Sequence, residues 1–144
     1  MSAQLLVTVV SGSPTSDGSR VVDEIMQRPH SEGLVAIVPK TRRKQRRVAD
    51  GVSVMPTTER LVRMGQGCSC CTVRGDLMTK IRRIAEEKSA ERVLVYTAAH
   101  ADLEILSKTF TVADEAGAVL SDVARIDSLV TVVDARRVIE TLAG

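Results

Sequence analysis

Three cysteines lie within four positions of the chain, which has no other cysteine. They stand in the segment GQGCSCCTVRGDL, residues 65–77, as Cys68, Cys70 and Cys71. Thiolates are soft ligands that suit Zn²⁺ and Cu(I), and thiols in the cytosol are kept reduced. The cluster therefore predicts a site for a thiophilic metal ion. Three sulfurs complete a trigonal Cu(I) site, whereas tetrahedral Zn²⁺ needs a fourth ligand or a water molecule, so the spacing does not choose between the two metals.

The backbone that carries the cysteines is expected to be irregular. On a regular strand Cys68 and Cys70 would share one face while Cys71 would face the opposite way, and Gly65 and Gly67 give the preceding chain conformational freedom. Two other roles for the cysteines stay open. They are a structural motif inherited from a metal-binding ancestor, or a thiol redox site in which Cys68 pairs with Cys71, because a bond between adjacent cysteines would be strained.

The apolar pattern predicts strands that alternate with helices. Aliphatic runs typical of parallel strands covered on both faces occur at 4–11, 33–39, 92–97 and 127–135, with a weaker candidate at 51–55. Apolar residues at helical spacing predict helices at 20–28, 77–88, 103–116 and from 135 onward. Asp76 is the expected N-cap of the second helix. The predicted fold class is a three-layer α/β domain with a mostly parallel sheet flanked by helices.

Composition limits the partners of this domain. The 144 residues suit one domain, 1–144, with a core built from aliphatic side chains, since 44% of the residues are hydrophobic but only 1% aromatic. Few aromatics and a net charge of +2 argue against nucleic acid as a partner. The run TRRKQRR, 41–47, is expected to be a solvated loop; the alternative is an electrostatic handle for an acidic protein, a nucleic acid or a membrane surface. No apolar segment reaches the roughly 18 residues that span a bilayer, so the expected location is cytoplasmic and away from membranes.

Four segments, in this order, resemble the nucleotide-binding domain of the CobW-type P-loop GTPases and metallochaperones. They are VTVVSG with its following loop and helix, GCSCCTVRGDL, VLVYTAAHAD and DSLVTVVDA. The family's Cys-x-Cys-Cys motif is followed by Thr-Val-Arg-Gly-Asp-Leu, and residues 68–77 match it throughout. The resemblance covers essentially the whole chain and implies a P-loop NTPase-like fold with metal bound at the cysteines. By the same analogy His100, in a loop after the neighbouring strand, is the candidate for a fourth ligand, against the alternative of an ordinary surface histidine.

The phosphate-binding loop departs from the family pattern. A P-loop reads G-x-x-x-x-G-K-[ST], in which the lysine neutralises phosphate charge and the hydroxyl holds Mg²⁺. Here residues 12–19 read GSPTSDGS, so that, counted from Gly12, Asp17 replaces the second glycine and Gly18 replaces the lysine. Gly12, Gly18 and Ser19 remain as a degenerate, weak nucleotide site. The alternative is a plain connection from strand to helix, with Asp17 or Ser16 as the helix cap.

Three further departures concern the rest of the family's nucleotide machinery. Tyr96 stands where the family has an acidic residue, and the segment after the second predicted strand, PKTRRKQRR, lacks the family's metal-binding glutamate. In the family, the Asn-Lys-x-Asp motif that selects guanine and the C-terminal part follow the segment that resembles DSLVTVVDA, and neither occurs within residues 1–144. These differences argue against GTP with Mg²⁺ as cofactors and predict no catalytic residue.

The sequence thus predicts a metal-binding, metallochaperone-like protein of metal homeostasis. It is expected to bind Zn²⁺ or Cu(I) through its Cys-x-Cys-Cys motif without effective nucleotide hydrolysis. The first alternative is a non-catalytic interaction module that pairs through an exposed sheet edge, either as a homodimer or with a protein client. The second is a weak GTPase.

Overall fold

The computed structural model describes most of the predicted elements. The residues described are 4–12, 17–29, 33–39, 47–57, 70–98, 107–108, 110–113 and 116–143, with the backbone alone at 57, 70–76, 98 and 141. Their order is β1, α1, β2, β3, α2, β4, a short 3-10 helix η1, β5 and α4.

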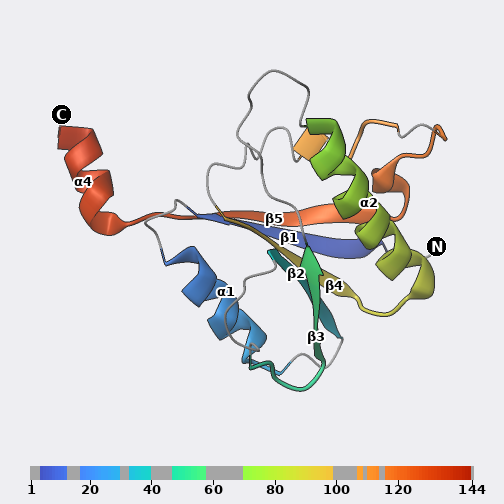
Figure 1. Ribbon diagram of the computed structural model, residues 1–144, viewed down its shortest axis with the longest axis horizontal. Helices are drawn as coiled ribbons and strands as arrows, with labels where there is room; N and C mark the ends of the chain where they lie inside the picture. Colours follow the sequence, from blue (N-terminus) through green and yellow to red (C-terminus); the bar gives the residue numbers. More distant parts are fainter. Residues whose placement is uncertain are drawn as a thin grey trace.

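Five parallel strands form one sheet with the order β3-β2-β4-β1-β5. The strands are β1 (Leu5–Gly12), β2 (Leu34–Pro39), β3 (Val52–Thr57), β4 (Arg92–Ala98) and β5 (Ala124–Val132). Figure 1 shows α1 (Gly18–Met26) and α2 (Cys70–Glu87) on opposite sides of this sheet. The predicted fold class, a three-layer α/β domain with a parallel sheet, is confirmed.

The interior strand β1 supplies side chains to both layers. Val7 and Val9 pack under α2 while Val10 packs under α1, as the alternation of side chains along a strand requires. All three are fully buried. A strand covered on both faces has no solvent side, which explains why the segment is a continuous aliphatic run.

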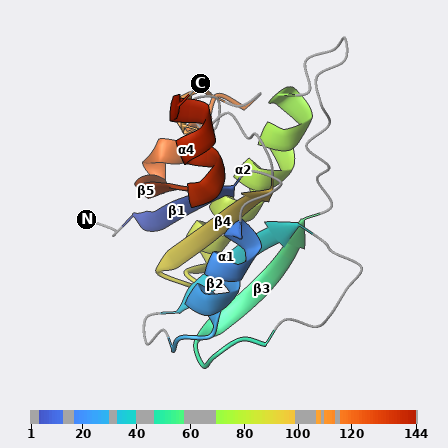
Figure 2. The ribbon, with the colours of Figure 1, turned by 90° about the vertical axis from the view of Figure 1, so that its left-hand side faces the viewer.

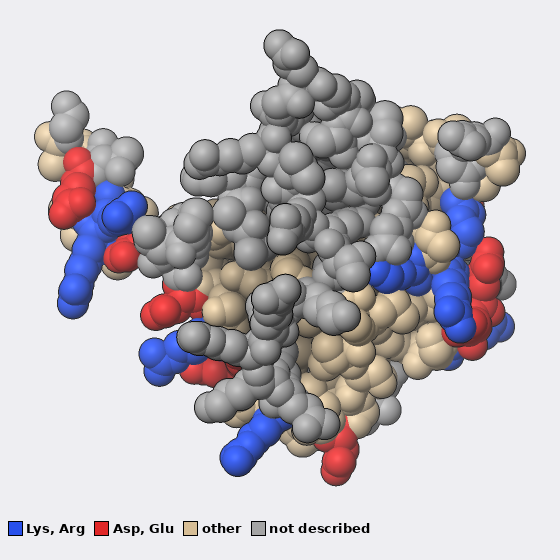
Figure 3. All heavy atoms as spheres, in the orientation of Figure 1, with Lys and Arg blue, Asp and Glu red and all other residues tan. Residues whose placement is uncertain are grey.

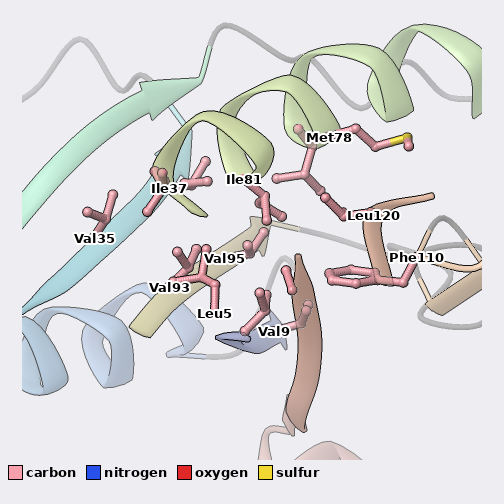
Figure 4. Close-up of a cluster of buried hydrophobic side chains, with 14 residues drawn as sticks. Leu5, Val9, Val35, Ile37, Met78, Ile81, Val93, Val95, Phe110 and Leu120 are labelled. Carbon is pink, nitrogen blue, oxygen red and sulfur yellow. The ribbon is translucent and has the colours of Figure 1, made fainter. Parts of the chain in front are cut away.

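The α2 layer holds the larger of the two apolar clusters. Ile81 and Met78 reach from α2 toward Val9 and Val95 of the sheet, and Phe110 and Leu120 close the far end of the cluster (Figure 4). On the other face Val22 and Met26 of α1 pack on β2 and β4. The core is therefore almost wholly aliphatic, as the composition predicts.

The beginning of α2 differs from the prediction. The helix starts at Cys70, so Asp76 lies inside it and is not its N-cap. A single glycine inside a helix costs only about 1 kcal/mol relative to alanine, and no proline interrupts 70–76. Gly75 is therefore carried within a helix of 18 residues instead of starting it. Cys70 and Cys71 accordingly have helical backbone, which corrects the expectation that an irregular segment holds them.

Other boundaries differ by a few residues. The last strand begins at Ala124 and ends at Val132, earlier at both ends than predicted, and β3 extends to Thr57. Half of the predicted helix 103–116 falls outside the described residues, and residues 110–113 are not helical, contrary to the prediction. Within it Ser107 and Lys108 are helical, and the amides of residues 110–112 donate hydrogen bonds back to their carbonyls in a closing turn. The helix α4 (Ala135–Ala143) follows β5 as predicted.

Candidate functional site at the carboxyl edge of the sheet

Two neighbouring strands, β1 and β4, end side by side in the middle of the sheet. Gly12 pairs with Ala98, and Ser11 pairs with Thr97. From β1 the chain crosses to β2, which lies beyond β4 in the sheet. From β4 it crosses in the opposite direction to β5, which lies beyond β1. Open α/β sheets bind ligands at such a switch point, outside the carboxyl ends of the strands. This edge is therefore the candidate site.

The N-terminus of α1 packs directly on β4 at this edge. Gly18, the first residue of α1, is buried. A Cβ atom at Gly18 would lie 3.2 Å from Cε2 and 3.2 Å from the hydroxyl oxygen of Tyr96, and 3.4 Å from the Cα of Gly12. Contacts this short leave no room for a side chain unless Tyr96 moves. Tyr96 itself is 9% exposed and belongs to the α1 layer of the core.

Asp17 and Ser19 flank this contact at the start of α1. Asp17 occupies the N-cap position, and its carbonyl accepts hydrogen bonds from the amides of Arg20 and Val21. Its side chain makes no capping hydrogen bond, so the capping role expected of it is not present in this conformation. Ser16 lies outside the described residues. Ser19 and Asp17 are both exposed, so the N-terminal end of α1 carries a negatively charged side chain.

Two buried hydroxyl groups lie one residue back from the strand ends. Ser11 is 6% exposed and Thr97 is 8% exposed, and they are partners in the parallel register. Thr97 donates from Oγ1 to the carbonyl of Val10 at 3.4 Å. This pair was not predicted from the sequence. Its signal is a hydroxyl residue at the end of each of two aliphatic strands, directly before Gly12 and Ala98.

The helix α2 brings two cysteines to the same edge of the sheet. Because α2 leads from the carboxyl end of β3 to the amino end of β4, its N-terminus lies at the carboxyl edge. Cys70 and Cys71 occupy the first turn of α2. The partial positive charge at a helix N-terminus favours the thiolate form of cysteine, which is the form that binds metals. Cys68 and His100 lie outside the described residues, and no group of three or more potential ligands occurs among the residues that are described.

The described residues carry charged side chains of both signs. On the face in Figure 3, the described Lys and Arg side chains are interspersed with Asp and Glu. Arg83 and Glu87 form an exposed ion pair at 2.7 Å near the end of α2, and the hydrogen bond to Glu87 raises the pKa of Arg83 above its ordinary value. None of the described helices is long and apolar enough to cross a membrane.

The parallel sheet, the switch point between β1 and β4 and a helix beginning after β1 are the features of a nucleotide-binding α/β domain. The chain belongs to the CobW/HypB/UreG nucleotide-binding domain family, whose profile matches residues 6–143. The resemblance seen in the four sequence segments is thereby confirmed.

One curated relative is similar over part of its length. It is a protein described as zinc-regulated GTPase metalloprotein activator 1 from Dictyostelium discoideum, 33% identical over 78 residues. These residues are 53% of this chain but only 16% of that protein. No solved structure matches the chain significantly.

Proposed function

We propose that this chain is a metal-binding, metallochaperone-like domain that holds Zn²⁺ or Cu(I) through Cys68, Cys70 and Cys71 and does not hydrolyse nucleotide effectively. The proposal that the chain does not hydrolyse nucleotide effectively rests on the contact of Tyr96 with Gly18. The metal half rests on the cysteine motif and on the position of two of its residues in the first turn of α2.

The metal site has support from chemistry and from family membership. The relative is named as a zinc-regulated activator of metalloproteins, and a role in metal homeostasis comes to this chain by that similarity. Thiolates suit Zn²⁺ and Cu(I), and a helix N-terminus promotes thiolate formation at Cys70 and Cys71. His100 is proposed as the fourth ligand of Zn²⁺, with water as the alternative. In this proposal the thiophilic ion is the cargo of the chain and takes part in no chemical reaction.

The nucleotide site has lost the groups that stabilise phosphate charge. Phosphoryl transfer depends on positioning and on cationic groups around the transferred phosphate. Gly18 stands at the position of the family's lysine, and the ring of Tyr96 fills the space into which a side chain from Gly18 would extend. Asp17 adds negative charge beside it. A nucleotide would therefore meet a carboxylate and an aromatic ring where the family has a cation and an acidic Mg²⁺ helper.

Native mass spectrometry tests the proposed metal binding. The untagged protein, purified without oxygen or chelator, is expected to carry one Zn²⁺ or Cu(I) per chain. The variant Cys70→Ser/Cys71→Ser is expected to lose this mass, while Ser69→Ala, a change in the same segment that removes no sulfur, keeps it. Equal metal content in the cysteine variant and the original protein would refute the site.

A weak GTPase is the second candidate, because the family is a nucleotide-binding one and Ser19 keeps the hydroxyl that binds Mg²⁺ in a P-loop. Calorimetric titration with GTP and Mg²⁺ at millimolar concentration separates the two candidates. No heat of binding is expected. Saturable binding together with phosphate release would favour the GTPase and overturn the proposed loss of nucleotide hydrolysis.

A further inference from the structure

Residues at the start of α4 favour the helix, but little of its apolar surface is covered by other parts of the structure. Asp134 precedes it, and its Oδ1 accepts a hydrogen bond from the amide of Arg136 at 3.0 Å, while its carbonyl accepts one from the amide of Val138 at 3.0 Å. This is the geometry of an N-cap. Figures 1 and 2 show α4 beyond the carboxyl end of β5, standing away from the sheet.

The side chains of α4 form one apolar stripe. The pattern is i, i+3, i+4, i+7 and i+8, and its members are Ala135, Val138, Ile139, Leu142 and Ala143. Ile139 is 69% exposed and Leu142 is 82% exposed. A helix of nine residues is marginal in water without packing, since helix stability comes mostly from the burial of such a face. The stripe therefore calls for a covering surface.

The charges beside the stripe make the helix complementary to itself. Arg136 and Glu140 are both exposed and, four positions apart, lie on the same flank of the helix. Suppose that two copies of α4 pack antiparallel, with the two-fold axis at the level of Val138. The residue two positions before Val138 on one helix then faces the residue two positions after Val138 on the other helix. Arg136 then faces the partner's Glu140, and the symmetry repeats the pair. Parallel packing would give neither pair.

We propose that two copies of this chain associate through an antiparallel α4–α4 contact. The contact consists of the apolar stripe and the two symmetric pairs of Arg136 with the partner's Glu140. Val133, which is 57% exposed at the base of α4, extends the apolar surface toward the sheet. Two helices of this length bury less than a standard interface does, so the dimer is weak and its population depends on concentration. The inference uses neither the cysteines nor the nucleotide edge, and it stands apart from the proposed function.

Sedimentation equilibrium on the full chain, between roughly 5 and 500 μM, tests the proposal. The original chain is expected to show a monomer–dimer equilibrium. Arg136→Glu places Glu opposite Glu twice, and Glu140→Arg places Arg opposite Arg twice. Each variant alone is expected to have a dimer dissociation constant at least about tenfold higher, because two attractive pairs become repulsive.

Mixing the two variants provides the sharper measurement. In the mixed dimer the glutamate introduced at position 136 of one copy faces the arginine introduced at position 140 of the other, and the unchanged Glu140 and Arg136 face each other. An equimolar mixture is therefore expected to regain the original affinity. The matched control is the pair Arg20 and Glu24 on α1, exposed and with the same spacing, 3.8 Å apart. Arg20→Glu and Glu24→Arg should leave the dimer unchanged. A monomer throughout the range, or charge variants that dimerise as the original does, would overturn the proposal.

Discussion

The Cβ position of Gly18 lies 3.2 Å from two atoms of the Tyr96 side chain, so the first residue of α1 and the fifth residue of β4 are fitted to each other. Under the proposal above, these are also two positions at which the nucleotide machinery is altered, and they share one space in the fold. A larger residue at position 18 therefore requires the side chain of Tyr96 to shift.

Gly18→Ala is therefore expected to destabilise the fold by about 1–3 kcal/mol, the usual cost of overpacking. In the background of Tyr96→Leu, which removes the atoms that the new Cβ would meet, the same change should cost markedly less. A double-mutant cycle on the free energy of unfolding in urea measures this coupling. Additive effects of the two changes would show that the contact does not limit position 18.

Ile81→Ala is expected to cost about 2–5 kcal/mol in the free energy of unfolding, because a fully buried side chain between α2 and the sheet is replaced by a cavity. The matched control is Glu86→Ala, an exposed change on the same helix, for which the difference should stay within about 0.5 kcal/mol. Urea unfolding followed by circular dichroism gives both values. A loss no larger for Ile81 than for Glu86 would contradict the placement of α2 in the core.

The strands β1, β2 and β4 were predictable because they are largely buried on both faces. Such strands need unbroken aliphatic runs, and the runs at β1, β2 and β4 carry no competing helical period. The start of α2 was not predictable from the same rules, since Gly75 and Asp76 are typical of a turn, and the helix instead continues through them to Cys70. Local preference is a weak guide to a boundary inside a long helix.

The candidate site was only partly predictable. The cysteine motif and the proposed changes in the phosphate loop are each read from a single segment. The contact between Gly18 and Tyr96 and the pairing of Ser11 with Thr97 join residues far apart in the chain. Such contacts depend on strand order and register, which no local pattern specifies. The exposed position of α4 was not predictable for the same reason. Its amphipathic pattern predicts a helix but does not say which surface covers the apolar face.

Asp134→Ala is expected to weaken α4 by about 0.5–2 kcal/mol, since the amide of Arg136 loses its side-chain acceptor. Asp134→Asn keeps an acceptor oxygen and should behave nearly as the original does. Hydrogen exchange of the amides in 135–143 reports this local change. The midpoint of global urea unfolding should move little, because α4 packs poorly on the sheet. Unchanged exchange in Asp134→Ala would contradict the cap.

Metal affinity is expected to fall as the pH is lowered. The proposed ligands Cys68, Cys70 and Cys71 bind as thiolates, so each must release a proton when the metal binds. Below the pKa of the thiols, protons compete with Zn²⁺, and the apparent affinity should drop progressively from pH 8 to pH 5. Competition with a chromophoric chelator whose own pH dependence is known measures the affinity. Alkylation supplies a second test at neutral pH, where added Zn²⁺ should protect all three cysteines from iodoacetamide. An affinity independent of pH, with no protection, would exclude thiolate ligation.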